Sequence, residues 1–268
     1  MQEILEALSL VKIFRLNNKQ QRLTHNSHKT KTALDGLSFS VRNGEIFGLL
    51  GPNGAGKTTA MRIAAGLIKS DHGDVFIDGF SVRKQIPEVQ KRIGFLSEDL
   101  RFDDFFTPSY LFDFFSTLRG LSKERTRERK ELLFDQFEIN EFAQERIATL
   151  SNGMKQKVSL VLSIAHEPEI IIFDEPTNGL DIVAARMVVD FLLELKKQGN
   201  TIIISTHIFS LVEKICDRVG IIIEGKMVFC DSLSRITEKT TIEDVFFSLF
   251  KELHGYKESG VSPCETGS

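Results

Sequence analysis

The sequence predicts an α/β fold with a mostly parallel central sheet. Two uninterrupted apolar runs, at residues 170–173 and 201–205, are typical of parallel strands that are covered on both faces. Stretches with apolar residues at helical spacing, at 183–198 and 208–216, lie between and after these runs. Strands that alternate with helices in this way indicate a parallel α/β sheet.

The N-terminal part predicts an antiparallel β subdomain, with strands at 5–14 and 33–41. The connection between them, 17–31, holds four Lys or Arg residues, two His and no acid, and it is long for a hairpin. We expect a solvated loop there, although its charge would also suit nucleotide phosphates, lipid head groups or a protein partner.

A helical subdomain is predicted as an insertion at about residues 100–167. Seven aromatic side chains crowd its first part, and a charged helix at 122–137 follows, with Ser122 as its N-cap. We interpret most of the cluster as the core of the insertion, and the alternative is a groove for a partner helix. The aromatic positions are Phe102, Phe105, Phe106, Tyr110, Phe112, Phe114 and Phe115.

The composition is that of an ordinary globular protein. The 268 residues are 41% hydrophobic and 26% charged, and we expect one domain over 1–233, then a helix at 241–253 and a disordered tail to 268. The net charge of −3 disfavours a nucleic-acid binder that relies on overall attraction. Three cysteines without metal-ligand spacing suggest reduced thiols. No apolar run approaches the ~18 residues of a membrane span, and no secretory signal begins the chain, so any membrane role would need a partner.

The clearest chemical motif lies between an apolar strand at 45–50 and a helical stretch at 60–67. It consists of Gly51, Pro52, Asn53, Gly54, Ala55, Gly56, Lys57, Thr58 and Thr59. The glycines let backbone N–H groups surround phosphate oxygens, and the following helix presents its unpaired N–H groups to the same anion. Lys57 would reach the β- and γ-phosphates, and Thr58 would bind Mg²⁺. The motif therefore predicts a P-loop NTPase core rather than a flexible glycine loop.

Two acidic residues follow the apolar run at 170–173. A carboxylate at the end of a strand beside the phosphate loop holds Mg²⁺ in this class of site, which assigns Asp174 to the metal. Glu175 would point a second carboxylate at the γ-phosphate and take a proton from the attacking water, or orient it. A solvated turn is the alternative for such a pair.

A second helix start suited to an anion begins at Ser151, a good N-cap before the helical stretch 158–165. The simplest reason for two phosphate-facing helix ends in one chain is that one of them serves a partner subunit.

In this order the motifs resemble an ATP-binding cassette ATPase over residues 5–233. Residues 51–59 match Walker A, 170–175 Walker B, 150–154 the signature sequence, 178–181 the D-loop and 205–207 the switch histidine. The resemblance implies ATP, Mg²⁺ and a head-to-tail dimer of identical or different cassettes. Each ATP would lie between one P-loop and Ser151, Gly153 and Asp181 of the signature and D-loop regions. His207 would contact the γ-phosphate, and Phe14 would stack on adenine.

Two departures from the family pattern occur. Asn152 and Met154 replace Gly and Gln in the signature, and Glu98 stands in place of the Q-loop glutamine, where its carboxylate would face Mg²⁺ or a water bound to it. Both resemble bacterial exporter-type single-cassette subunits. In that group the aromatic helical region receives the coupling helix of a separate polytopic membrane subunit.

We therefore expect an ATP-hydrolysing transporter subunit, an exporter, with Glu175, His207 and Lys57 in catalysis. It would lie at the cytoplasmic face of the cell membrane, bound to its membrane subunit. The alternative is a soluble cassette ATPase acting on ribosomes or DNA. The single cassette, without a heptad array, favours the transporter, so no nucleic-acid partner is expected. A non-hydrolysing regulator is disfavoured because Glu175 and His207 are both present.

Overall fold

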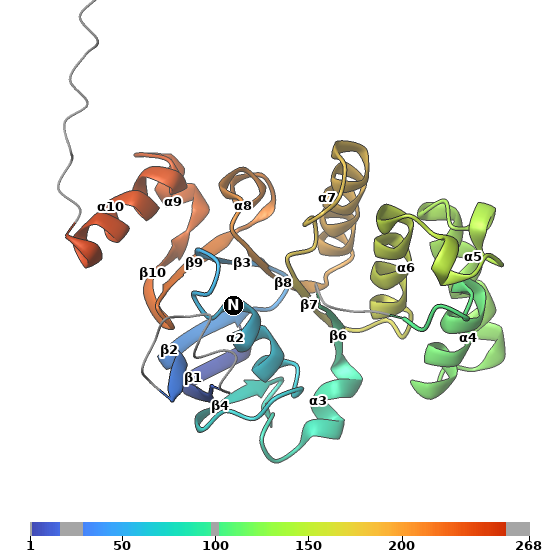
Figure 1. Ribbon diagram of the computed structural model, residues 1–268, viewed down its shortest axis with the longest axis horizontal. Helices are drawn as coiled ribbons and strands as arrows, with labels where there is room; N and C mark the ends of the chain where they lie inside the picture. The colour runs from blue at the N-terminus through green and yellow to red at the C-terminus, as the bar shows by residue number, and fades with distance from the viewer. Residues whose placement is uncertain (1, 17–28, 98–101, 256–268) are drawn as a thin grey trace, which may run out of the picture.

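The computed structural model describes residues 2–16, 29–97 and 102–255. Two sheets organise these residues: four strands in the order β2-β1-β4-β5, and six in the order β10-β9-β3-β8-β7-β6 (Figure 1). The first sheet is antiparallel throughout, whereas in the second only the β9–β10 pair is antiparallel. The predicted α/β fold, with a mostly parallel sheet and an N-terminal antiparallel sheet, is confirmed.

The antiparallel sheet packs against the parallel one through a shared apolar cluster. Its strands are β1 (Glu3–Arg15), β2 (Thr30–Arg42), β4 (His72–Ile77) and β5 (Phe80–Ser81). Phe39 of β2 stacks on Phe47 of the parallel sheet with ring centroids 5.6 Å apart. Leu5, Leu10 and Leu34 in the same cluster are completely buried. The sheet is therefore anchored over the start of the nucleotide motif.

The parallel sheet brings the ends of its central strands to one edge. Its strands are β3 (Ile46–Leu50), β6 (Ile93–Leu96), β7 (Ile170–Asp174), β8 (Thr201–Thr206), β9 (Arg218–Ile223) and β10 (Lys226–Ser232). Every residue of β3, β7 and β8 is buried, as expected for strands covered on both faces. Leu50 pairs with Thr206, and Asp174 pairs with Ser205, so three chain segments leave the sheet together.

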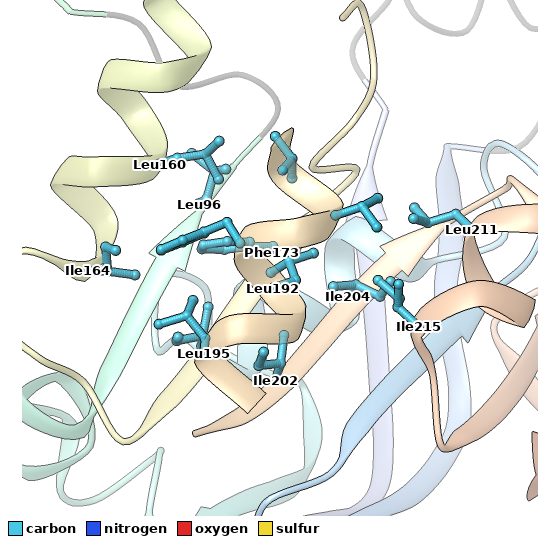
Figure 2. Packing of buried hydrophobic residues seen from close by; sticks show 14 of the residues in the cluster. Leu96, Leu160, Ile164, Phe173, Leu192, Leu195, Ile202, Ile204, Leu211 and Ile215 are labelled. Atoms are coloured by element: carbon cyan, nitrogen blue, oxygen red, sulfur yellow. The ribbon is translucent and has the colours of Figure 1, made fainter. Parts of the chain in front are cut away.

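Helices cover both faces of the parallel sheet. They are α2 (Lys57–Ala64), α3 (Ile86–Arg92), α7 (Ile182–Lys197) and α8 (Phe209–Ile215). On the α7 face, Leu192 and Leu195 lie against Phe173 and Ile202 of the sheet (Figure 2). A fully buried Leu stabilises the fold by about 1.5–3 kcal/mol, and this cluster holds many such side chains. This packing therefore keeps the edge of the sheet that carries the site rigid.

The insertion lies between β6 and β7, where it forms a lobe beside the sheet (Figure 1). It contains α4 (Pro108–Leu118), α5 (Lys123–Gln136), two short 3₁₀ turns (Asn140–Phe142 and Ile147–Thr149) and α6 (Asn152–Ile164). Ser122 caps α5 as predicted, because its hydroxyl accepts the Arg125 N–H at 3.1 Å. Phe137 packs edge-on against Phe191, with ring centroids 4.6 Å apart, and so joins the lobe to α7.

The expectation that most of the aromatic cluster forms the core of the insertion is wrong. Phe112 is fully buried, but Phe105 is 76% exposed, Tyr110 50% and Phe114 49%. Phe106, Tyr110 and Phe114 stack in sequence, with centroid distances of 4.9 and 6.2 Å. Tyr110 and Phe114 are four residues apart and share one exposed face of α4, and Phe106, just before the helix, extends their stack.

The C-terminal helix covers α8. It is α10 (Ile242–His254), which corresponds to the helix expected at 241–253, and the short α9 (Leu233–Thr237) before it was not predicted. Phe246 of α10 packs on Phe209 of α8 with ring centroids 5.3 Å apart. The expected tail, Glu98 and most of the basic loop lie outside the described residues. None of the helices in the described ranges has the length and apolar character needed to cross a bilayer.

A partly buried histidine, His166, predicts how the stability of the fold depends on pH. His166 Nε2 donates to the Ile93 carbonyl oxygen at 3.0 Å and so joins the end of α6 to β6. Burial lowers the pKa of His166 to about 4, and the positive charge of Arg119 adds to the shift. Because the pKa falls on folding, the stabilisation is complete above about pH 6.5 and is lost as the pH falls toward 4.

We therefore expect the denaturation midpoint of the wild type to fall more steeply between pH 6.5 and 4 than that of His166→Gln. Chemical denaturation across this range measures the difference. The control is His72→Gln, which changes an exposed histidine and should follow the wild type. Parallel curves for all three proteins would contradict the assignment.

Candidate functional site

The glycine-rich loop runs from the end of β3 to the start of α2. A Cβ at Gly51 would overlap the carbonyl oxygen of Ile222, and one at Gly56 would lie 2.5 Å from the carbonyl oxygen of Ala33. Gly56 also has a φ of 108°, in the left-handed region that favours glycine. No acidic residue occupies the first turn of α2. The backbone can therefore come close to an anion at the N-terminus of this helix.

Two other parts of the parallel sheet hold this loop in place. The Gly225 N–H, in the turn between β9 and β10, donates to the Ala55 carbonyl oxygen at 2.9 Å. The Gly51 N–H donates to the carbonyl oxygen of Thr206, the last residue of β8, at 3.3 Å. Backbone hydrogen bonds to two other segments thus hold the cradle in place.

The Lys57 side chain lies inside the loop and is 5% exposed. It donates to the carbonyl oxygens of Gly51 at 2.7 Å and Pro52 at 3.3 Å. Its Nζ is 3.3 Å from Glu175 Oε1. A buried cation that is held by weak neutral acceptors and one carboxylate can exchange them for phosphate oxygens.

The Asp174 carboxylate is almost completely buried at the end of β7. Its Oδ1 accepts hydrogen bonds from the hydroxyls of Thr58, at 3.1 Å, and of Ser205. Its Oδ2 is buried without a hydrogen-bond partner. Burial raises the pKa of Asp174, and the two hydroxyl groups oppose the shift. A buried carboxylate oxygen without a partner, beside a hydroxyl, fits Mg²⁺, which binds one or two carboxylates together with waters and phosphates.

The Glu175 backbone directs its carboxylate into the cavity. Its φ of 51° is left-handed, which is uncommon for a residue other than glycine and is often found at functional sites. Two hydrogen bonds hold this conformation. The Glu175 N–H donates to the Ser205 carbonyl oxygen at 3.1 Å and to the Ser205 hydroxyl oxygen at 3.2 Å. The His207 Nδ1 lies 3.1 Å from both carboxylate oxygens. Glu175 therefore stands between Lys57 and His207.

One cavity brings most of the predicted nucleotide residues together. Phe14, at the end of β1, contributes to its wall although it is far from the loop in sequence. The lining consists of Phe14, Lys31, Ala33, Asn53, Gly54, Gly56, Lys57, Thr58, Thr59 and Glu175. Lys31 was considered only as part of the basic loop, and Ser205 only as part of the histidine motif.

The predicted residues of the signature and the D-loop lie elsewhere. Ser151 caps α6 by accepting the Met154 N–H at 3.2 Å, and Asp181 caps α7 by accepting the Ala184 N–H at 2.8 Å. Neither they nor Gly153 line the Lys57 cavity. A second hollow lies beside them, lined by Asn152, Lys155, Gln156, Asn178 and Gly179 among others. One chain therefore presents two separate surfaces, each with part of the predicted site.

Ser205 holds both carboxylate residues, so we expect Ser205→Ala to slow the ATP hydrolysis that the sequence predicts. The change would leave Asp174 with one hydroxyl donor and weaken the support of Glu175. The loss of a buried hydrogen-bond partner costs about 1–3 kcal/mol of stability. Steady-state hydrolysis and chemical denaturation measure the two effects.

The control is Ser163→Ala, a buried serine whose hydroxyl donates to the Leu160 carbonyl oxygen at 2.6 Å within α6. It should lose stability without a matching loss of turnover. Equal turnover of the two variants would contradict a positioning role for Ser205.

The model of the ABC transporter family matches residues 34–178. NatA, an ABC transporter ATP-binding protein of Bacillus subtilis, is 35% identical over 226 residues, which cover 84% of this chain and 92% of NatA. Nod factor export ATP-binding protein I of Burkholderia orbicola is 35% identical over 198 residues, which cover 74% of this chain and 65% of that protein. A solved ATP-binding subunit of an ABC transporter aligns with a TM-score of 0.80 and 26% identity, and the alignment covers 92% of this chain and 100% of that chain. The chain therefore belongs to the ABC transporter family, among its ATP-binding proteins.

Proposed function

We propose that this protein hydrolyses ATP as the cassette subunit of an exporter and closes as a dimer to drive a separate membrane subunit. The observation that carries the proposal is the division of the site. Lys57 and Glu175 line one cavity, and Asp174 is held against its wall by the Thr58 hydroxyl, whereas the Ser151 helix start opens on another surface. A second copy, or a related cassette, would supply the missing half.

In and beside this cavity, the charged residues would have separate roles. Lys57 would bind the β- and γ-phosphates. Thr58 and Asp174 would hold Mg²⁺, which neutralises charge on the phosphates when it is bound. Glu175 would orient the attacking water or accept its proton, and His207 would contact the γ-phosphate beside it. The 3.1 Å contact between His207 and Glu175 supports this placement.

The start of α7 supports the dimer. Ile182 and Val183 directly follow Asp181 and are 89% and 78% exposed. Adjacent large apolar side chains with this much exposure indicate a surface that a partner covers. Their position beside the D-loop and the second hollow suits burial against another cassette.

The face of α4 supports a membrane partner. Phe105 and the stack of Phe106, Tyr110 and Phe114 form an exposed aromatic surface, which we call the aromatic stripe. A groove nearby is lined mainly by apolar side chains, including Phe95, Phe102, Phe115 and Leu162. An amphipathic helix from a membrane subunit would bury both.

Export is the direction we propose, at the cytoplasmic face of the cell membrane. The name of the Nod factor export relative supports it, together with the signature variant containing Asn152 and Met154. The aromatic stripe supports a protein partner rather than nucleic acid, in keeping with the net charge of −3.

Glu175→Gln tests the reaction and the dimer together. We expect turnover to fall by roughly 100-fold or more, because the variant lacks the general base. ATP should then hold the variant as a dimer, which light scattering detects. Glu138→Gln, which changes an exposed carboxylate paired with Lys157 on the insertion, is the control and should behave as wild type. A Glu175→Gln protein that stays monomeric with ATP, alone and with its membrane subunit, would refute the proposal.

Phe105→Ser together with Tyr110→Ser tests the aromatic stripe. Because both side chains are exposed, we expect stability to change by less than about 0.5 kcal/mol, with basal turnover retained. Binding to the membrane subunit, measured by copurification, should be lost. Leu132→Ser, an exposed apolar position on α5, is the control and should bind normally. Normal binding by the double variant would place the docking surface elsewhere.

A further inference from the structure

Lys31 is a charged side chain of the cavity that the proposed reaction leaves without a role. It lies near the start of β2 and lines the same wall as Phe14 and Ala33. Its position in the register pairs it with Phe14. Side chains directly opposite on paired strands project from the same face, so Lys31 and Phe14 both reach the cavity.

The position of Lys31 along β2 determines which part of a nucleotide it can meet. The Ala33 carbonyl oxygen lies against Gly56, at the start of the helix that receives the phosphates. Lys31 lies two residues before Ala33 in β2, about 7 Å from it along the strand. It therefore lies on the Phe14 side of the cradle, beyond the end that Lys57 occupies. A nucleotide that extends from Lys57 toward Phe14 passes it with its α-phosphate and ribose.

The charge balance of the cavity leaves Lys31 uncompensated. The charged side chains in the lining are Lys31, Lys57 and Glu175, and the last two form an ion pair at 3.3 Å. Across residues 2–16, 29–97 and 102–255, no carboxylate forms an ion pair with Lys31. A lysine ammonium is a mobile point charge on a flexible stem and is well suited to a phosphate oxygen.

Lys12, the other lysine near Phe14, already has a carboxylate partner. The Lys12 Nζ lies over the Phe14 ring, 5.5 Å from its centroid, and 3.3 Å from Asp71 Oδ1. Asp71 Oδ2 accepts the Ile13 N–H at 2.6 Å, and this hydrogen bond lowers the pKa of Asp71. Lys12 is thus held by Asp71 above the Phe14 ring, whereas Lys31 has no carboxylate partner among the described residues and can bind a ligand.

We propose that Lys31 binds the α-phosphate of the nucleotide and thereby sets the affinity for ATP and ADP alike. The inference rests on the ATP site of the proposed function and adds a contact to it. ADP shares the α-phosphate with ATP and lacks only the γ-phosphate. A contact at the α-phosphate therefore affects both nucleotides equally, whereas one at the γ-phosphate affects ATP alone.

The test compares Lys31→Met, Lys31→Arg and the wild type by calorimetric titration with ATP and with ADP, in EDTA so that no hydrolysis occurs. Lys31→Met should weaken both affinities by the same factor, about tenfold, as expected for a partly exposed charge-assisted hydrogen bond. Lys31→Arg keeps the charge and should retain most of the affinity. Arg15→Met is the matched control, because it removes a positive charge from the end of β1 next to Phe14 and outside the cavity lining.

Each outcome is decisive. An equal loss for ATP and ADP, absent from Arg15→Met, establishes the α-phosphate contact. Unchanged affinity of Lys31→Met, or a loss confined to ATP, overturns it while the proposed function stands. If the wild type binds neither nucleotide even when Mg²⁺ is supplied, the proposed function itself fails.

Discussion

The pairing of β7 with β8 is the constraint on which the site depends. It places Asp174 opposite Ser205, so one hydroxyl donates to the Asp174 carboxylate and accepts the Glu175 N–H. A shift of one residue would turn every side chain to the other face of the sheet and separate these groups. The left-handed conformation of Glu175 persists because this pairing supplies its two hydrogen bonds. The geometry of this site is thus a property of the sheet.

Local motifs explain why the fold class and much of the cavity could be predicted. The loop at 51–59 carries its chemistry in consecutive residues, and the end of the strand at 174–175 does the same. The contacts of Lys31 and Ser205 could not be assigned in this way, because they arise from the register against β1 and β7. Phe14 was placed only by resemblance to a family. Its approach to Lys57 depends on how the two sheets pack, which no local pattern encodes.

The aromatic cluster shows a different limit. The density of Phe and Tyr indicates that apolar surface must be covered, but not what covers it. Within one turn of α4, Leu111 and Phe112 are buried while Tyr110 and Phe114 are exposed. Helical spacing assigns residues to faces but does not show which face meets the protein's own core. The structure decides this point, and the surface left open is where we place a partner.

The site also concentrates charge where a stable fold would avoid it. Lys57, Asp174 and Glu175 are all nearly buried, and removal of ions from water is expensive even when they are paired. Burial raises the pKa of Asp174, which means that the fold opposes its ionisation. A cation near Oδ2 would stabilise the buried charge of Asp174, and phosphate oxygens near Nζ would stabilise that of Lys57. Part of the ligand-binding free energy would therefore come from offsetting the cost of burying these charges. The closely packed sheet keeps the charged side chains in place despite that cost.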